Sequence, residues 1–331
     1  IRKLPAVETL GSVTVICSDK TGTLTQNRMT VTILDVAGNQ INLQERLKDY
    51  SPTVNKLDQP EPFPAGETSV PLLLLGASLC NDATLEEDSE QPGEFSAVGD
   101  PTEGALVIAA ARAGFWKAEL EAQLPRVAEL PFDSDRKRMT TLHAIQPGEQ
   151  FAAFETLCED ANQANARLVA FTKGAVDGML EQSSHVLAEG CVQPLDEQWK
   201  RRIQKANNEL SENGMRVLGV AYRFHDSVEA AKSKDFESGL VMIGLVGMID
   251  PARPEVKDAV AKAKSAGVRT IMITGDHPLT ALHIARDLGI TQNAEVVTGQ
   301  DLQKLSLDEL EVSVEKTSVY ARVSPDHKLK I

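Results

Sequence analysis

"ICSDKTGTLTQN", residues 16–27, places a single aspartate, Asp19, directly after a short apolar run. Val, Thr, Ile and Cys at residues 13–17 predict a buried strand that ends just before this aspartate. Ser, Asp, Thr and Gly are ordinary turn residues, so the stretch also fits a polar turn without any further role. The alternative hypothesis is that Asp19 is a nucleophile at a place where a phosphate group binds. The rest of the chain decides between these two interpretations.

Composition sets the first limits. The 331 residues are enough for two domains with cores of their own, and the 42% hydrophobic and 25% charged content is typical of a soluble globular protein. A formal net charge of −14 argues against a surface that coats nucleic acid, so we expect no nucleic-acid partner. A local cluster of Lys and Arg is still compatible with a nucleotide site.

The apolar segments and the cysteines point to a soluble piece of a longer protein. The most apolar stretches, residues 70–80 and 239–249, are about half of the roughly 20 residues that a membrane span needs. The chain begins at Ile1 without a signal peptide and stops within an expected helix. The cysteines lack metal-ligand or paired spacing, which is typical of free thiols in a reducing compartment. They are Cys17, Cys80, Cys158 and Cys191.

The order of the expected strands and helices divides the chain into two domains. From residue 240 onward the two alternate regularly, which predicts parallel strands with helices on both faces of the sheet. The strand at 13–17 resembles this block, whereas the residues between follow no such rhythm. We therefore predict a Rossmann-like α/β domain of residues 1–30 and 249–331, interrupted by an inserted α+β domain with an antiparallel sheet at 31–248. In the regular block we expect strands at 239–250, 268–276 and 317–323 and helices at 254–267 and 278–289.

Within the inserted segment, β-branched residues around Ala-Gly-Asn predict a hairpin at 29–43. Pro-rich and acidic compositions predict solvated loops at 51–69 and 85–96. The remaining patterns predict helices at 103–114 and 195–214 and strands at 139–145, 149–154, 166–174 and 215–223.

Polar residues follow several expected strands of the parallel sheet. Ligands of such sheets bind beyond the carboxyl ends of the strands, where Asp19, Asp250, the triplet 274–276 and Arg322 fall. Phosphoryl transfer to a carboxylate requires a nucleophile, cations for the phosphate oxygens and hydroxyl or N–H donors. Asp19 is the candidate nucleophile, and Lys328 is a candidate cation. Candidate donors are Thr21, Gly22, Thr23, Thr274 and Gly275.

These residues resemble the phosphorylation motif of P-type cation-transporting ATPases. Besides "SDKTGTLTQN", the chain contains "LPAVETLG", "KGA" at 173–175, "DPARPEV", "MITGDH" and "ARVSPDHK", in the order of the pump motifs. Ala252 replaces the second proline of the pump's Asp-Pro-Pro-Arg hinge. "LPAVETLG", "CND" at 80–82 and "VGDPTEGAL" look most like the calcium-pump branch.

The resemblance implies a haloacid-dehalogenase-type phosphorylation domain that uses ATP and Mg²⁺. Asp19 would take the γ-phosphate of ATP as an aspartyl-phosphate, with Lys20, Thr274 and Lys328 completing the catalytic set. Asp19 and the carbonyl of Thr21 would bind Mg²⁺. Many related hydrolases have a second Asp at the position of Thr21, and that Asp activates water. The threonine hydroxyl cannot do so. The aspartyl-phosphate of this chain should therefore persist. The resemblance also implies that three further motif residues bind the phosphate or the cofactor. They are Gly275, Asp276 and Arg322.

The resemblance also implies a nucleotide pocket in the inserted domain. Phe132 matches the aromatic that stacks on adenine, although without the match a core or turn phenylalanine would be the simpler interpretation. Ser134 stands where animal calcium pumps carry an arginine. Arg136 or Arg138 would add a cation–π or phosphate contact, or both are exposed strand residues. The other residues carried over are Glu103, Lys137, Lys173, Gly174 and Arg216.

Several parts of such a pump are absent from this sequence. The family's Gly-Asp-Gly-x-Asn-Asp motif, which completes the Mg²⁺ site, is expected beyond Ile331, so the phosphorylation domain would be C-terminally truncated and inactive alone. Membrane helices and an actuator domain of the same polypeptide are the expected partners, with this region on the cytoplasmic face of a membrane. The alternatives are a pump for another cation, a free-standing phosphatase with a large cap, and a non-catalytic nucleotide-binding module. Thr21 and "KGA" count against the phosphatase.

Overall fold

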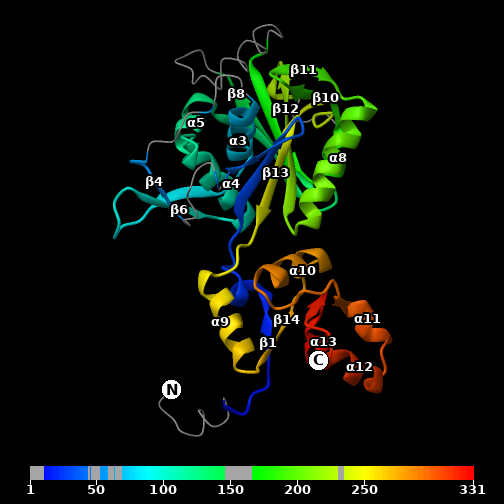
Figure 1. The fold of residues 1–331 in the computed structure, drawn as a ribbon. Helices are drawn as coiled ribbons and strands as arrows, with labels where there is room; N and C mark the ends of the chain where they lie inside the picture. Colours follow the sequence, from blue (N-terminus) through cyan, green and yellow to red (C-terminus); the bar gives the residue numbers. More distant parts are fainter. Residues whose placement is uncertain are drawn as a thin grey trace. The chain divides into compact units, whose positions relative to one another are not determined.

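The computed structural model describes residues 11–43, 45, 53–58, 63, 69–145, 166–229 and 235–331. The chain forms two compact units (Figure 1). The terminal unit consists of Ile1–Arg28, Ser211–Met215 and Asp250–Ile331, and the central unit consists of Met29–Leu210 and Arg216–Ile249. Both ends of the chain therefore contribute to one unit, and the other is inserted between them.

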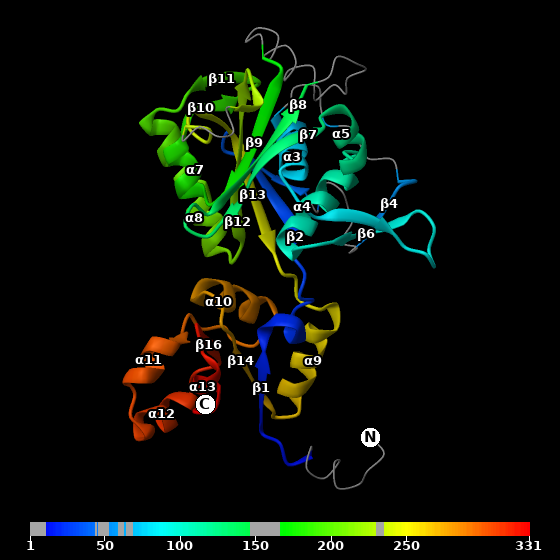
Figure 2. The ribbon, with the colours of Figure 1, turned by 180° about the vertical axis from the view of Figure 1, so that it is seen from behind.

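A parallel sheet forms the middle of the terminal unit. Its strand order is β1-β14-β16-β15, and all three neighbouring pairs are parallel (Figures 1 and 2). The strands are β1 (Val15–Asp19), β14 (Arg269–Ile273), β15 (Val297–Thr298) and β16 (Val319–Ala321). The helices are α9 (Pro254–Ser265), α10 (Pro278–Asp287), α11 (Gly299–Lys304), α12 (Leu307–Val314) and α13 (Pro325–Lys328).

Alternating side chains of β14 and β16 divide between two apolar clusters. Met272 and Val319 pack with residues of α9 and α10, whereas Ile273 and Tyr320 pack with residues of α11 and α12. Successive side chains of a strand point to opposite faces, so this division places helices on both faces of the sheet. The predicted parallel sheet with helices at 254–267 and 278–289 is confirmed.

Two predictions about individual strands are wrong. The strand at 13–17 was expected to be buried, yet Val15 and Ile16 of β1 are each 42% exposed. The reason is that, within the described part of the chain, β1 lies at an edge of this sheet and pairs with β14 alone. The strand expected at 239–250 is β13 (Leu240–Ile249), and it belongs to the central sheet rather than to the parallel one.

The central unit is built on a nine-stranded sheet. Its main path is β11-β10-β13-β12-β9-β8-β7, with β2 also paired to β13 and β3 to β2. Every pair is antiparallel except β10 with β13. The other strands are β2 (Thr30–Val36), β3 (Asn39–Asn42), β7 (Arg126–Asp133), β8 (Arg138–Ala144), β9 (Leu168–Gly174), β10 (Ser183–Ala188), β11 (Cys191–Pro194) and β12 (Arg216–His225).

The chain enters and leaves the central sheet through neighbouring strands. β2 and β13 are antiparallel partners, and Thr30, the first residue of β2, lies opposite Ile249, the last residue of β13. The predicted hairpin at 29–43 is confirmed as β2 and β3. Its turn contains Ala37 and Gly38, both with positive φ, as the tight hairpin turn requires.

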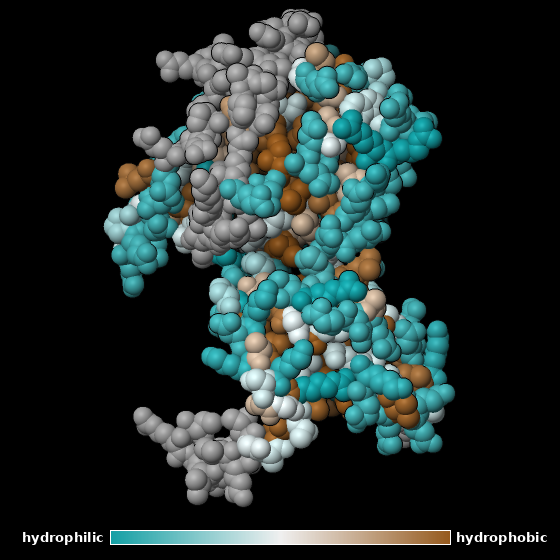
Figure 3. Space-filling model, viewed as in Figure 1, coloured by the Kyte–Doolittle hydropathy of each residue, from teal (hydrophilic) through white to brown (hydrophobic). Residues whose placement is uncertain are grey.

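Helices cover both faces of the central sheet (Figures 1 and 2). α3 (Ser69–Leu79), α4 (Pro101–Arg112) and α5 (Lys117–Gln123) pack on one face, and α7 (Val176–Gln182) and α8 (Glu197–Glu212) pack on the other. α8 buries Ile203, Ala206 and Leu210, and its outer surface is hydrophilic (Figure 3). The predicted helices at 103–114 and 195–214 are confirmed within a few residues.

The most apolar run of the sequence forms a core helix. Every residue of α3 is buried, because the helix lies between the sheet, α4 and α5. A helix that is apolar on all sides needs such complete burial. In the described part of the chain, no helix combines the length and the hydropathy needed to cross a membrane.

The predicted acidic loop at 85–96 is a β-hairpin instead. β5 (Thr84–Glu87) pairs with β6 (Glu94–Val98), and β4 (Val54–Asn55) pairs with the other edge of β6. Leu85, Phe95 and Ala97 pack against a small apolar cluster under α4, and this packing outweighs the acidic composition. The strand predicted at 149–154, Cys158 and most of the loop at 51–69 lie outside the described residues.

Gly174 allows the ends of β8 and β9 to approach closely. A Cβ at this position would lie 2.5 Å from the Cβ of Arg138 and 2.6 Å from the carbonyl oxygen of Lys137. We expect Gly174→Ala to lower the free energy of unfolding by about 1–3 kcal/mol through overpacking, as measured by urea denaturation. Gly178→Ala in α7 is the control, since its Cβ would have no neighbour closer than 3.9 Å. Equal stability of the two variants would contradict this packing role.

Candidate functional site

The first site, called the β1 site, lies at the carboxyl ends of β1 and β14. Asp19 is the last residue of β1 and lies opposite Ile273, the last residue of β14. Thr274 follows directly, is 1% exposed, and donates its backbone N–H to the carbonyl of Tyr320 at 2.9 Å. Its hydroxyl oxygen accepts a hydrogen bond from the N–H of Asp276 at 3.1 Å. Parallel pairing therefore brings the segments around Asp19 and Thr274 together.

A lysine from the far end of the chain binds the candidate nucleophile. The Nζ atom of Lys328, in α13, lies 2.5 Å from Oδ2 of Asp19, and both side chains are partly exposed to solvent. The interaction joins residues that are 309 positions apart in sequence. The structure therefore brings the candidate nucleophile and the candidate cation together, and both side chains are accessible to a ligand.

Lys20, next to the nucleophile, has a different environment. It is 5% exposed, and its ammonium forms ion pairs with Asp276 and, at 3.9 Å, with Asp250. Asp250 also accepts hydrogen bonds from the hydroxyl of Thr25 at 2.6 Å and from the N–H of Arg28 at 3.1 Å. Since a buried charge requires partners, this cluster connects the chain that follows Asp19 to Asp250 and Asp276.

The loop after β1 exposes its polar residues beside Asp19. Residues Lys20–Leu24 form a single irregular turn, η1, in which Gly22 has a φ of 74°. Thr21, Gly22 and Thr23 are exposed, and the carbonyl of Gly22 accepts a hydrogen bond from Arg253 at 3.0 Å. This arrangement leaves the threonine hydroxyls accessible to a phosphate group.

Gly275 and Arg322 complete the residues predicted here. A Cβ at Gly275 would come no closer than 4.0 Å to another residue, so the space above this backbone is open. Arg322 has a φ of 51°, and its N–H donates to the carbonyl of Asp276 at 3.0 Å. Its side chain is exposed.

The oxygen atoms of Asp19 and Thr21 are ligands of the kind that Mg²⁺ prefers. Asp250 and Asp276 are engaged by Lys20. Among the described residues, no group of three or more His, Cys, Asp or Glu side chains is arranged to hold a metal ion. Asp19 and Thr21 therefore fit Mg²⁺ as two of its oxygen ligands. Phosphate oxygens and water would supply the others.

The second site, called the β9 site, lies at one end of the central sheet. The register places Gly174 of β9 opposite Arg138 of β8, and Asp133 of β7 opposite the same arginine. On the other side of β9, Gly174 lies opposite Gly219 of β12. The antiparallel register thus brings predicted residues of β7, β9, β12 and the turn between β7 and β8 to one end of the sheet. They are Phe132, Lys137, Lys173 and Arg216.

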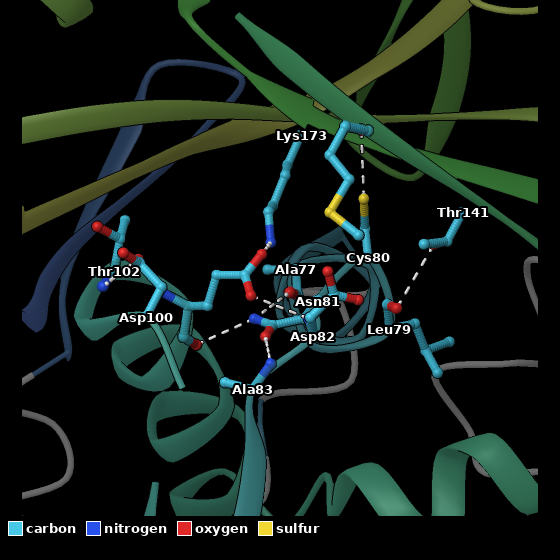
Figure 4. A network of polar contacts seen from close by, with 12 residues as sticks. Ala77, Leu79, Cys80, Asn81, Asp82, Ala83, Asp100, Thr102, Thr141 and Lys173 are labelled. Carbon is cyan, nitrogen blue, oxygen red and sulfur yellow. Dashed lines mark hydrogen bonds and ion pairs between the residues drawn. The ribbon is translucent and has the colours of Figure 1, made fainter. Parts of the chain in front are cut away.

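A buried ion pair lies at the base of the β9 site. Nζ of Lys173 is 2.5 Å from Oε1 of Glu103, and the two side chains are 8% and 16% exposed. The other carboxylate oxygen of Glu103 accepts the N–H of Asp82 at 3.0 Å, and its carbonyl accepts the amide of Asn81 at 3.0 Å. Figure 4 shows this network, in which Asp100 caps α4. Lys173 and Glu103 are therefore one unit rather than two independent groups.

The other predicted residues of the β9 site are accessible. Phe132 is 64% exposed, which is unusual for a phenylalanine and leaves its ring free for stacking. Lys137 is exposed at a φ of 53°, and Ser134 lies in the exposed turn before it. Arg216 is exposed, and its guanidinium donates to the hydroxyl of Thr102 at 2.6 Å.

The two arginines near Phe132 have a role that the sequence did not indicate. Arg136 and Arg138 bind the carboxylate of Glu237 at 2.6 and 2.7 Å. The alternative of two exposed strand residues is wrong, because Arg136 lies in a turn and both arginines are partly buried by this pairing. The ligand contact stays a prediction. Glu237 lies in a turn-rich segment without a motif, and its role could not be found without the fold.

The sequence also matches a protein-family model. The model of the family described as "P-type ATPase, cytoplasmic domain N" matches residues 69–255, which is more than half of the chain. The chain therefore belongs to the P-type ATPase family.

Several relatives with similar sequences are named calcium-transporting ATPases. Calcium-transporting ATPase 1 of Bacillus cereus is 42% identical over 332 residues, and Calcium-transporting ATPase 1 of Lactococcus lactis subsp. lactis is 38% identical over 332. Calcium-transporting ATPase of Bacillus subtilis is 38% identical over 333 residues. Each alignment covers 100% of this chain but only 32%, 33% and 35% of the respective relative. The chain spans about a third of the length of these relatives.

The environment of Lys20 yields a stability prediction. Lys20→Met removes the cation that neutralises Asp250 and Asp276, and we expect a loss of about 3 kcal/mol, since breaking a buried ion pair leaves uncompensated charge. Hydrogen exchange of β14 amides in increasing urea measures this loss in the terminal unit. Lys257→Met is the control, because its pair with Asp287 is solvent-exposed and should contribute less than about 1 kcal/mol. A loss no larger than that of the control would contradict the assigned role.

Proposed function

We propose that this chain is the ATP-binding and phosphorylated region of a P-type cation pump. The observation that carries the proposal is the β1 site, where the accessible carboxylate of Asp19 ends a parallel strand and binds the ammonium of Lys328. In this proposal the terminal unit is a Rossmann-like, haloacid-dehalogenase-type phosphorylation domain. The central unit is the inserted nucleotide-binding domain.

The chemistry follows from the groups around Asp19. A carboxylate oxygen of Asp19 attacks the γ-phosphorus of ATP, and the bond from this phosphorus to the β–γ bridging oxygen breaks. ADP leaves with the bonding electron pair, and an aspartyl-phosphate remains. Lys328 then neutralises the charge of the phosphoryl oxygens, while Thr21 and the N–H of Gly275 donate hydrogen bonds. Lys20 and Thr274 hold the two strand ends in place.

Thr21 explains why the phosphorylated state would last. A neutral hydroxyl does not act as the base that activates water, in contrast to a carboxylate at this position. Hydrolysis of the aspartyl-phosphate at Asp19 would then depend on another part of the protein. A free-standing phosphatase would not benefit from such a delay, whereas a pump that couples hydrolysis to a conformational change would.

Magnesium ion, when bound to Asp19 and the carbonyl of Thr21, would supply positive charge to the phosphate oxygens. The other two carboxylates of the β1 site, Asp250 and Asp276, are neutralised by the ammonium of Lys20. Asp250 and Asp276 share Lys20, so they contribute order rather than metal ligands.

The β9 site would bind the nucleoside part of ATP. The exposed ring of Phe132 offers a stacking surface for adenine, and the Glu103–Lys173 pair offers an acceptor and a donor for its polar edge. Lys137 and Arg216 are exposed cations suited to the phosphates. The backbone of Gly174 allows the close approach of strands that forms this end of the sheet.

The transported ion is inferred from the relatives, several of which are named calcium-transporting ATPases. We propose that the whole protein is a calcium pump of the membrane, with this region on the cytoplasmic side. Its partners would then be the membrane helices and actuator domain of the same polypeptide. A pump for another cation is the alternative. Ion-stimulated ATPase activity of the full-length protein in vesicles separates the two.

The nucleophile is tested in the full-length protein. We expect Asp19→Asn to abolish formation of an acid-stable, hydroxylamine-labile phosphoprotein from γ-labelled ATP, because an amide does not form the acyl phosphate. Binding of ATP should remain. Asp287→Asn on the exposed side of α10 is the control and should incorporate label like the wild type. Stoichiometric label on the Asp19→Asn protein would disprove the assignment.

The adenine contact is tested in the 331-residue chain. Base–aromatic stacking contributes about 1–3 kcal/mol, so Phe132→Ala should raise the Kd for ATP roughly ten- to a hundredfold. Isothermal titration with ATP measures the change. Val192→Ala is the control, since this side chain is also exposed but lies on β11 at the other edge of the sheet. Unchanged affinity of the Phe132→Ala chain would refute the stacking role.

A further inference from the structure

A buried carboxylate, Glu237, lies behind the β9 site. Its residue is 6% exposed, and its oxygens accept hydrogen bonds from Arg136 at 2.6 Å, Arg138 at 2.7 Å and the hydroxyl of Thr140 at 2.8 Å. Burial raises the pKa of Glu237, but the hydrogen bonds from Arg136, Thr140 and Arg138 outweigh it and leave the pKa below its usual value. The carboxylate is therefore charged at neutral pH and fully engaged.

The two arginines bind the turn between β7 and β8 from both sides. Arg136 also donates to the carbonyl of Pro131 at 2.7 Å, directly before Phe132. Arg138 also donates to the carbonyl of Arg136 at 3.3 Å. Within the turn, a carboxylate oxygen of Asp133 accepts the N–H of Arg136 at 2.8 Å. Glu237 thus connects the residues before, within and after the turn.

This turn carries two exposed groups proposed to bind ATP, Phe132 and Lys137. An exposed ring receives little positional restraint from packing, so its place depends on the backbone that carries it. Lys137 adopts a left-handed backbone conformation, which persists only when surrounding interactions hold it. Without Glu237, the guanidinium groups of Arg136 and Arg138 would lose their shared counter-ion, and the turn would keep fewer links to the sheet, among them the hydrogen bond from the N–H of Ala175 to the carbonyl of Lys137.

We propose that Glu237 is a positioning residue for nucleotide binding. Through Arg136 and Arg138 it holds residues 131–137 in one conformation, so that Phe132 and Lys137 are ordered before ATP arrives. Preorganisation of this kind improves affinity because less conformational freedom is lost on binding. Glu237 itself contacts no nucleotide in this scheme. The inference rests on the proposed nucleotide-binding function of the central unit.

The first measurement concerns the nucleotide-free chain and does not depend on ATP. Hydrogen exchange of the Arg136 and Lys137 amides, which donate within the turn, should be about tenfold faster in Glu237→Gln than in wild type. Exchange in the distant helix α8 should stay unchanged. Wild-type exchange rates in the turn of this variant would overturn the proposal.

The second measurement is ATP affinity of the 331-residue chain. Glu237→Gln should raise the Kd for ATP about five- to tenfold, and the Phe132→Ala chain should lose little more on adding Glu237→Gln. Additive losses in the double variant would overturn positioning through Phe132. Glu129→Gln is the control, because this exposed carboxylate also pairs with an arginine of β7 and should leave the Kd unchanged.

A second variant covers the case in which Glu237→Gln does not fold. Arg136→Gln keeps the buried pair of Glu237 and Arg138 but removes the contact to Pro131, and its Kd for ATP should also rise about fivefold. A wild-type Kd would overturn the proposal. If instead the wild-type chain binds no ATP, the proposed function fails, and the hydrogen-exchange result still decides the role of Glu237 in ordering the turn.

Discussion

The parallel pairing of β1 with β14 is the interaction on which the β1 site depends. It joins residues 15–19 to residues 269–273, so the chain between them must be closed into a loop before the site exists. The register sets Asp19 beside the end of β14, from which Thr274 and Asp276 follow. Lys20 then places its buried ammonium between Asp250 and Asp276. Strand pairing, register and charge compensation together leave the carboxylate of Asp19 exposed.

Sequence patterns predicted the parallel sheet, its main helices and the strand-end position of Asp19, because these follow from local periodicity and from the chemistry of strand ends. They failed where pairing decided the outcome. The apolar side chains of β1 are exposed because the strand lies at an edge, and β13 joins the antiparallel sheet although it precedes a strand–helix alternation. The acidic composition of residues 85–96 concealed a hairpin, since three apolar residues sufficed to anchor it.

In the candidate sites too, sequence motifs predicted single residues but not the contacts between distant residues. Motifs identified Lys173 and Glu103 individually, but their ion pair depends on the packing of α4 against the central sheet. Arg136 and Arg138 were visible in the sequence, whereas their partner Glu237 is about 100 residues away and belongs to no pattern. Three lysines of the candidate sites form ion pairs with carboxylates, namely Lys20, Lys173 and Lys328. In the proposed function, a phosphate group that binds Lys328 would compete with the carboxylate of Asp19.

The antiparallel pairing of β2 with β13 has a consequence for the history of such a protein. Because Thr30 and Ile249 lie opposite each other, the inserted unit begins and ends at a single point of the backbone. For the terminal unit, such an insertion is equivalent to a long hairpin loop. Domains tolerate insertions whose two ends are close together. Each unit has a sheet of its own, so a substitution in one sheet leaves the strand pairing of the other unchanged.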